Sequence, residues 1–255
     1  MQRIRQPRVA ELVASRLRDD ILTGRLAEGD VLPSQEALFA EFGVSPPAVR
    51  EAIHILESDG LISVRRGNVG GAVVHLPSAE RTAQMISMVL QTRAATPGDV
   101  SEALLHLEPI CAGLCAGRAD RMTEVVPYLR AAIDAQSEQF DTPARYVPNA
   151  RRFHEELVSR CGNEPMILLI GALELIWSAH ESAVWSDEHH PDDPMNPTTM
   201  RAALRDHHRL LDAIADGNTA RAQRLAAAHL AAARRNTLAA GADKTIEAKL
   251  ISNRD

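Results

Sequence analysis

The chain has 255 residues, of which 45% are hydrophobic and only 3% aromatic, and its formal net charge at pH 7 is −6. This length permits one large or two modest domains, and a core built mainly from Leu, Ala, Ile and Val favours helices. A net negative charge argues against a generally basic nucleic-acid-binding protein, so any phosphate contact must come from local groups of cations.

The N-terminal third predicts a helix-turn-helix preceded by a supporting helix. Apolar residues recur at helical spacing over Val9–Thr23. Ser34 is a favourable N-cap for a short helix over Gln35–Phe42. Ser45 then caps a second helix, in which Pro46 takes the first position, where a missing N–H costs little.

A β-hairpin wing is predicted next. Two β-like runs, Leu61–Val64 and Ala72–Val74, flank a glycine-rich turn that begins with Arg65 and Arg66. The N-terminus of the second helix suits entry into the major groove, where Arg50 could contact a base edge or a phosphate. The alternative is a winged domain that binds a protein, but two adjacent arginines at a glycine-lined tip favour DNA.

These residues resemble a known family. The stretch LPSQEALFAEFGVSPPAVREAIHILESDGLISVRRGNVGGAVV is similar to the DNA-binding domain of GntR-family transcription regulators. Glu36 and Pro46 stand where the family usually has arginine, so we do not expect the usual operator sequence. The candidate DNA-binding residues are Ser34, Ser45, Pro46, Arg50, Arg65, Arg66, Gly67 and Asn68.

The rest of the chain contains only helical patterns, so the predicted fold class is mainly α, a winged helix-turn-helix followed by an all-helical bundle. The domains are placed at 1–76 and 81–240, with a linker over 77–80 and a loose tail over 241–255. The polar, proline-rich stretch Asp187–Pro197 is predicted to be a surface loop. The helices are expected near Ala79–Gln91, Gly98–Ala119, Thr123–Gln139, Ala144–Cys161, Pro165–Trp185, Thr198–Asp216 and Thr219–Ala240.

Cysteine usage and the lack of long apolar segments suggest a cytoplasmic protein. The three cysteines, Cys111, Cys115 and Cys161, have no disulfide-framework spacing and are interpreted as reduced core residues. We find neither a signal peptide nor a segment apolar enough to span a membrane.

Three histidines fall on apolar helix faces. His207 and His229 are equidistant from the tight turn at Asn218, so they lie level in an antiparallel hairpin. His154 shares an apolar face with Phe153 and Leu157. A single inward histidine is more often a core residue, but three neutral imidazoles suit a divalent ion such as Zn²⁺ or Ni²⁺.

The helical half resembles the FCD effector-binding domain of the FadR subgroup, through RRFHEELVSRCGN, DHHRLLDAIADGN and ARAQRLAAAHL. The resemblance implies metal ligands at His154, His207 and His229. The family's fourth ligand, an Asp, corresponds to Ala150, which cannot bind metal. Either water or the effector completes a three-histidine site, or the histidines hold an organic effector directly.

Further polar residues on or near inward faces are candidates for the effector pocket. They are Glu108, Asn149 and His180. The competing interpretation is structural, because a buried Glu or His needs a partner in any case, such as an arginine or a backbone group.

Together these features predict a ligand-responsive transcription regulator, a repressor and homodimer that binds a short inverted repeat and responds to a small carboxylate. One alternative is a metal sensor in which the ion itself is the signal. Another is a metal-dependent hydrolase, but the sequence contains no HExxH motif and no nucleophile elbow, so no enzymatic activity is expected.

Overall fold

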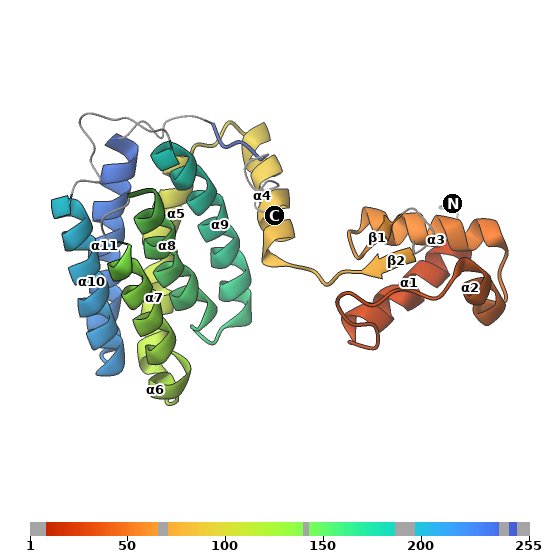
Figure 1. The fold of residues 1–255 in the computed structure, drawn as a ribbon, viewed down its shortest axis with the longest axis horizontal. Helices are drawn as coiled ribbons and strands as arrows, with labels where there is room; N and C mark the ends of the chain where they lie inside the picture. Colours follow the sequence, from red (N-terminus) through yellow and green to blue (C-terminus); the bar gives the residue numbers. More distant parts are fainter. Residues whose placement is uncertain (1–8, 66–70, 140–142, 187–196, 240–244, 249–255) are drawn as a thin grey trace, which may run out of the picture. The chain divides into compact units, whose positions relative to one another are not determined.

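The structure, a computed structural model, describes residues 9–65, 71–139, 143–186, 197–239 and 245–248. The chain divides into two compact units, Met1–Ser78 and Ala79–Asp255, each with its own hydrophobic core (Figure 1). The mainly helical fold predicted from the sequence is confirmed, and the described strands form one two-stranded antiparallel sheet.

The first unit contains three helices and the hairpin. Its elements are α1 (Val9–Leu22), α2 (Gln35–Phe42), α3 (Pro46–Ser58), β1 (Ile62–Arg65) and β2 (Gly71–Val74). The strands pair in register from Ile62 opposite Val74 to Arg65 opposite Gly71. The apolar faces of the three helices and the hairpin close over one core, which includes Val13, Leu17, Ile21, Leu38, Val49, Leu56 and Val74.

Helices α2 and α3 begin differently, although a serine precedes each. The Ser34 hydroxyl accepts a hydrogen bond of 3.2 Å from the Ala37 amide and thereby caps α2. Gly43 ends α2 in the left-handed conformation, at φ 63°, where a side chain would be strained. Ser45 occupies the N-cap position of α3 but makes no side-chain capping bond, so that part of its predicted role is wrong. Pro46, preset for the helical φ, starts α3 instead.

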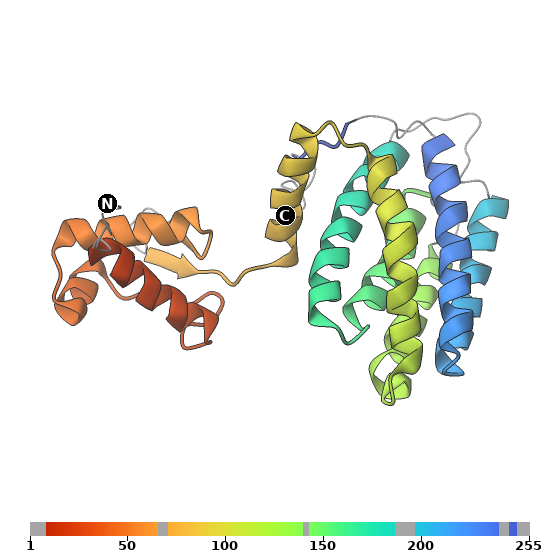
Figure 2. The same ribbon diagram turned by 180° about the vertical axis from the view of Figure 1, so that it is seen from behind.

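The second unit is a bundle of helices. Helices α5 and α11 pack along each other, as do the pairs α7 with α8, α8 with α9 and α10 with α11, and α4 packs on α9 (Figure 2). The bounds are α4 (Ala79–Thr92), α5 (Pro97–Gly117), α6 (Arg121–Glu124), α7 (Val126–Glu138), α8 (Pro143–Ser159), α9 (Glu164–Ser186), α10 (Pro197–Ala215) and α11 (Thr219–Ala239).

The structure departs from the expected helices at one place. The single helix predicted over Thr123–Gln139 is divided into α6 and α7 at Val125. Pro127 lies in the first turn of α7, where a proline is tolerated. In a continuous helix its ring would clash with the Thr123 carbonyl, so the chain restarts the helix there.

The C-terminal tail also differs from the expectation of a loose segment, in the four of its residues that the structure describes. Ile246 is fully buried, and its amide donates to the Ala95 carbonyl at 2.9 Å. The Glu247 amide donates to His180 Nε2 at 3.0 Å, and the Ala248 amide donates to Gln91 Oε1 at 3.1 Å. One buried apolar side chain and three hydrogen bonds place residues 245–248 against α4 and α9. Of the predicted loop, residues 187–196 lie outside the described residues.

Candidate functional site

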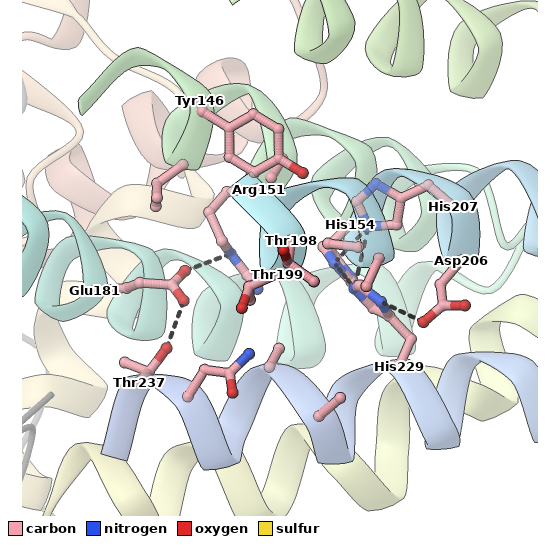
Figure 3. A pocket seen from close by; sticks show the side chains of 17 residues that line it. Tyr146, Arg151, His154, Glu181, Thr198, Thr199, Asp206, His207, His229 and Thr237 are labelled. Atoms are coloured by element: carbon pink, nitrogen blue, oxygen red, sulfur yellow. Dashed lines mark hydrogen bonds and ion pairs between the residues drawn. The ribbon is translucent and has the colours of Figure 1, made fainter. Parts of the chain in front are cut away.

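The three predicted histidines meet inside the helical unit. His154 comes from α8, His207 from α10 and His229 from α11, and their exposed fractions are 3%, 1% and 6%. The Nε2 atom of His207 lies 3.3 Å from that of His154 and 3.1 Å from that of His229, and the third separation is 3.3 Å (Figure 3). The three rings therefore turn the same nitrogen toward one point.

The local sequence explains two of these placements. Gly217, at φ 71°, makes the tight turn between α10 and α11, and this hairpin brings His207 level with His229. His207 also stacks on Phe153, with ring centroids 4.1 Å apart, and Phe153 is the neighbour of His154 on α8. The apolar face predicted for α8 thus positions both an imidazole ligand and the ring that orients another.

An oxygen atom lies behind each imidazole, at hydrogen-bond distance for His154 and His207. His154 Nδ1 lies 2.5 Å from Glu108 Oε1, and His207 Nδ1 lies 2.8 Å from Gln136 Oε1. His229 Nδ1 faces the Asp206 carboxylate at 3.9 Å. Carboxylate and amide oxygens only accept, so the Nδ1 atoms of His154 and His207 carry the protons and their Nε2 lone pairs point inward.

The protonation states suit metal binding. Burial lowers the pKa of His154 to about 4 and lowers that of His207 well below its ordinary value. Both rings are therefore neutral at pH 7. The interaction with His229 lowers the pKa of Asp206, so this carboxylate is ionised beside the cluster.

The donor set fits a divalent ion. A Zn²⁺ ion with bonds of about 2.0–2.1 Å and tetrahedral angles separates its ligand nitrogens by about 3.3 Å. The observed separations, 3.1 to 3.3 Å, agree with that value. Among the residues that the structure describes, a search for three or more His, Cys, Asp or Glu side chains close enough to hold an ion finds these three histidines.

A cavity of about 260 Å³ opens beside the cluster (Figure 3). All three histidines line it, and so does Ala150, so a carboxylate at that position would face the same space. The remaining lining is partly apolar and partly polar. Its polar members are Tyr146, Arg151, Glu181, Thr198, Thr199, Asp206, Asn236 and Thr237.

The predicted effector residues Glu108, Asn149 and His180 do not line this cavity, so that prediction is not supported. Glu108 orients His154. The His180 Nδ1 atom lies 2.9 Å from the Ile176 carbonyl, and its Nε2 accepts from the Glu247 amide. Asn149 precedes Ala150 and is turned about 100° from it around the helix. The two buried groups, Glu108 and His180, have structural partners, as the competing interpretation proposed.

Sequence patterns missed most of the polar lining. A charged residue such as Arg151 is ordinarily expected on the solvent face of a helix, yet Arg151 is 4% exposed and pairs with Glu174 and Glu181. A usable signal was present, because Arg151 precedes His154 by three residues and therefore shares its face. Asp206 is the neighbour of His207, and nothing in the periodicity of α10 distinguished it.

The first unit presents its candidate DNA-binding residues to solvent. Helix α3 buries Val49 and Leu56, whereas Ser45, Pro46 and Arg50 are exposed near its N-terminus, and Ser34 is exposed at the start of α2. Arg66, Gly67 and Asn68 lie outside the described residues, as does the side chain of Arg65. An exposed helix N-terminus with a cation one turn inside suits a major groove and its phosphates.

A winged helix-turn-helix joined to a helical unit with a buried ligand cavity defines a class, the DNA-binding regulators that respond to small molecules. Residues 9–73 match the family described as bacterial regulatory proteins, gntR family, and residues 99–232 match the FCD domain. The chain belongs to the GntR family and carries an FCD domain. It is a sequence-specific, ligand-responsive transcription regulator.

The curated relatives agree with this assignment, and a solved structure shares the fold. The chain is 26% identical over 230 residues to the HTH-type transcriptional repressor NanR of Klebsiella aerogenes, covering 88% of this chain and 83% of that protein. It is 29% identical over 175 residues to NanR of Salmonella bongori, covering 67% of this chain and 64% of that protein. Streptococcus agalactiae GntR shares the fold, with a TM-score of 0.68 at 21% identity over 89% of this chain and 99% of that one.

These relatives are named as transcriptional repressors. Among the helices of the part that the structure describes, none is long and apolar enough to cross a membrane.

Proposed function

We propose that this protein is a homodimeric repressor whose affinity for its operator is changed by a small carboxylate. The carboxylate enters the cavity of the helical unit and binds next to a divalent ion, Zn²⁺ or Ni²⁺. His154, His207 and His229 hold that ion. The operator is a short inverted repeat, because one winged domain reads too few base pairs for useful specificity and two copies read a symmetric site.

One observation carries the proposal. Three buried Nε2 atoms lie within 3.1 to 3.3 Å of one another at the wall of a cavity. The Nε2 lone pairs of the neutral His154 and His207 rings face each other and repel, and each forgoes a hydrogen bond to water. Such an arrangement is expected where a cation fills the space between them, and the acceptors behind the rings are those that metal-binding histidines commonly have.

The histidine end of the cavity would suit one anionic oxygen once it holds a divalent ion. A divalent ion held there supplies a Lewis-acid position for a carboxylate oxygen. Because Ala150 contributes no carboxylate, the three imidazoles leave room for that oxygen on the cavity side. The ligand would then join α8, α10 and α11, which each contribute one histidine.

Coupling to DNA follows from thermodynamic linkage. If the carboxylate binds the operator-bound and free states with different affinities, operator and effector change each other's affinity by the same factor. Metal and effector are linked in the same way, so each should tighten the binding of the other.

The test uses the full chain. Elemental analysis after purification in metal-replete buffer should find about one divalent ion per subunit, and a chelator should remove it. An operator selected from random DNA is then titrated by fluorescence anisotropy with metal, with chelator, and with small carboxylates. A change in operator affinity that needs both metal and carboxylate supports the proposal. The absence of stoichiometric metal, or an effector response that survives the chelator, contradicts the role of the histidines.

A matched pair of variants isolates the site. His207→Ala should abolish metal binding and the effector response while operator binding without effector stays within about twofold, since the winged unit is untouched. His208→Ala is the control, because His208 is the exposed neighbour on the same helix. Equal metal content in the two variants would contradict the assignment.

A second candidate, a metal sensor, is favoured by the closed environment of the cluster. All three rings are buried and each Nδ1 faces an acceptor, which is a donor set that could bind an ion strongly without any organic ligand. In that case metal alone should shift operator affinity as much as metal with carboxylate. Titration of the operator complex with Zn²⁺ in the absence of organic acids separates the two candidates.

A further inference from the structure

The cavity has two polar ends of different character. One end holds the three histidines and Asp206, and the other holds Arg151, Glu181 and Thr237 (Figure 3). Thr237 follows His229 by eight residues on α11, which corresponds to about 12 Å along the helix axis. Alanine side chains of α8, α10 and α11 line much of the wall between these ends.

The end opposite the histidines carries an excess of negative charge. Arg151 forms ion pairs with both Glu174 and Glu181, and the side chains of all three are at most 6% exposed. One guanidinium therefore faces two carboxylates, and the formal charge of the group is −1. Arg151 is already compensated, so it offers little attraction to an additional anion.

Glu181 also retains an unused acceptor. Its Oε1 atom accepts a hydrogen bond of 2.9 Å from the Thr237 hydroxyl. Its Oε2 atom is buried, lies 3.5 Å from Arg151 Nε, and has no hydrogen-bond donor. A buried carboxylate oxygen without a donor is costly, and a donor supplied by a ligand would remove that cost.

A second carboxylate on the ligand would be repelled at this end of the cavity. It would bring a negative charge to a buried group that is already negative, where like charges are weakly screened. A hydroxyl or an ammonium group would instead donate to Glu181, and hydrogen bonds to charged groups are among the stronger ones.

We infer that the effector is a carboxylic acid whose distal end donates hydrogen bonds, a hydroxy acid or an amino acid, and that Glu181 selects this end and rejects dicarboxylates. The inference rests on the proposed function, in which the effector carboxylate binds at the histidine end. It adds Glu181 as the residue that determines specificity, a role that depends on the pairing of Arg151 with two carboxylates.

Matched linear acids test the inference in the full-length, Zn²⁺-loaded protein by calorimetry. Four acids of each chain length differ only at the distal end: adipate, 6-hydroxyhexanoate, 6-aminohexanoate and hexanoate, with the four- and five-carbon series to vary the reach. The hydroxy and amino acids should bind at least about tenfold more tightly than the dicarboxylate of equal length, the effect of one hydrogen bond to a charged group. Equal or tighter binding of the dicarboxylates at every length overturns the inference.

Two variants separate direct contact from net charge. Glu181→Gln removes the charge at the cavity wall, and Glu174→Gln removes the same charge from the group through a residue that does not line the cavity. Glu181→Gln should bring the ratio between amino acid and dicarboxylate close to one, whereas Glu174→Gln should lower it by less. Equal effects of the two variants would mean that only net charge matters and would overturn the contact with Glu181. The wild-type series decides the main point even if a variant does not fold.

Failure of the inference can be distinguished from failure of the proposed function. If dicarboxylates bind best and a chelator abolishes their binding, the proposed function stands and the role of Glu181 is wrong. If none of the acids binds at any length with or without Zn²⁺, both are wrong, because the cavity then accepts no carboxylate.

Discussion

The two units of this protein place their candidate functional residues in opposite ways. In the winged unit, Ser34, Ser45, Pro46 and Arg50 lie within one short stretch of sequence and are exposed. In the helical unit, the cavity draws on α8, α9, α10 and α11, and its charged and imidazole groups are mostly buried. The first site is a local surface, and the second exists only after the bundle has formed.

This difference has an energetic consequence. Exposed side chains that make no capping bond contribute little to folding, so changes there should alter binding and leave stability nearly unchanged, whereas Ser34 also caps α2. Buried charged groups must be compensated, so changes in the cavity should alter both. Four experiments test this contrast, beginning with the one for which the greatest change is expected.

The largest effect is expected from Arg151→Ala. The variant leaves Glu174 and Glu181 buried without their cation, and breaking a buried ion pair in this way costs about 3–5 kcal/mol. Urea unfolding measures the loss. Arg152→Ala is the control, because Arg152 is the exposed neighbour, and it should stay within about 0.5 kcal/mol. A loss below about 1 kcal/mol for Arg151→Ala would show that this charged group is not a structural necessity.

In the winged unit, Arg50→Ala should weaken operator binding by about 1–3 kcal/mol without lowering the unfolding free energy. Arg66→Ala should weaken binding to all DNA sequences and reduce the salt dependence by about one phosphate contact. Fluorescence titration at several salt concentrations measures both, with the exposed Arg93→Ala of the helical unit as the control. Unchanged affinity in both variants would mean that α3 is not the recognition helix.

A smaller gain is expected at the metal site. Ala150→Asp restores a carboxylate on the cavity wall beside the histidines and should raise metal affinity by about tenfold, the scale of one added favourable ligand. Asn149→Asp adds the same charge one residue away and about 100° around the helix, so it should change the affinity little. Calorimetric titration with Zn²⁺ compares them, and equal gains would attribute the effect to net charge and not to coordination.

The smallest effects concern the helix caps. Ser34→Ala removes the hydrogen bond to the Ala37 amide and should destabilise the winged unit by about 1 kcal/mol. Ser45→Ala removes no side-chain capping bond and should cost less. Thermal unfolding followed by circular dichroism tests this pair. An equal loss in both variants would show that the cap of α2 has no special importance.

Much of the fold could be predicted because its signals are local. Ser34, Ser45 and Pro46 located the helix-turn-helix, and helical patterns of apolar residues located most bundle helices. Where a local signal was overlooked, as with Pro127, the helix bounds were wrong. The histidine pair in the α10–α11 hairpin could also be predicted, since a tight turn fixes which residues lie level with each other.

The rest of the site could not be predicted from such local sequence signals. The periodicity of a helix reports a hydrophobic face, and charged residues are normally expected on the opposite, solvent-facing side. Arg151 and Glu181 break that rule because they compensate each other across α8 and α9, and Glu108 breaks it because His154 is its partner. Glu108 and His180 were recognised as inward groups, but whether an inward polar residue supports a neighbour or faces a ligand depends on what lies opposite.

The winged domain, the helical bundle, the family and the three imidazoles could be inferred from the sequence, because each depends on spacings within one helix, one hairpin or one contiguous motif. The groups that surround the imidazoles and the negative charge at the far end of the cavity became known from the three-dimensional fold. Those properties come from side chains on separate helices that meet in a buried space, where unbalanced charges are weakly screened and each polar atom needs a partner.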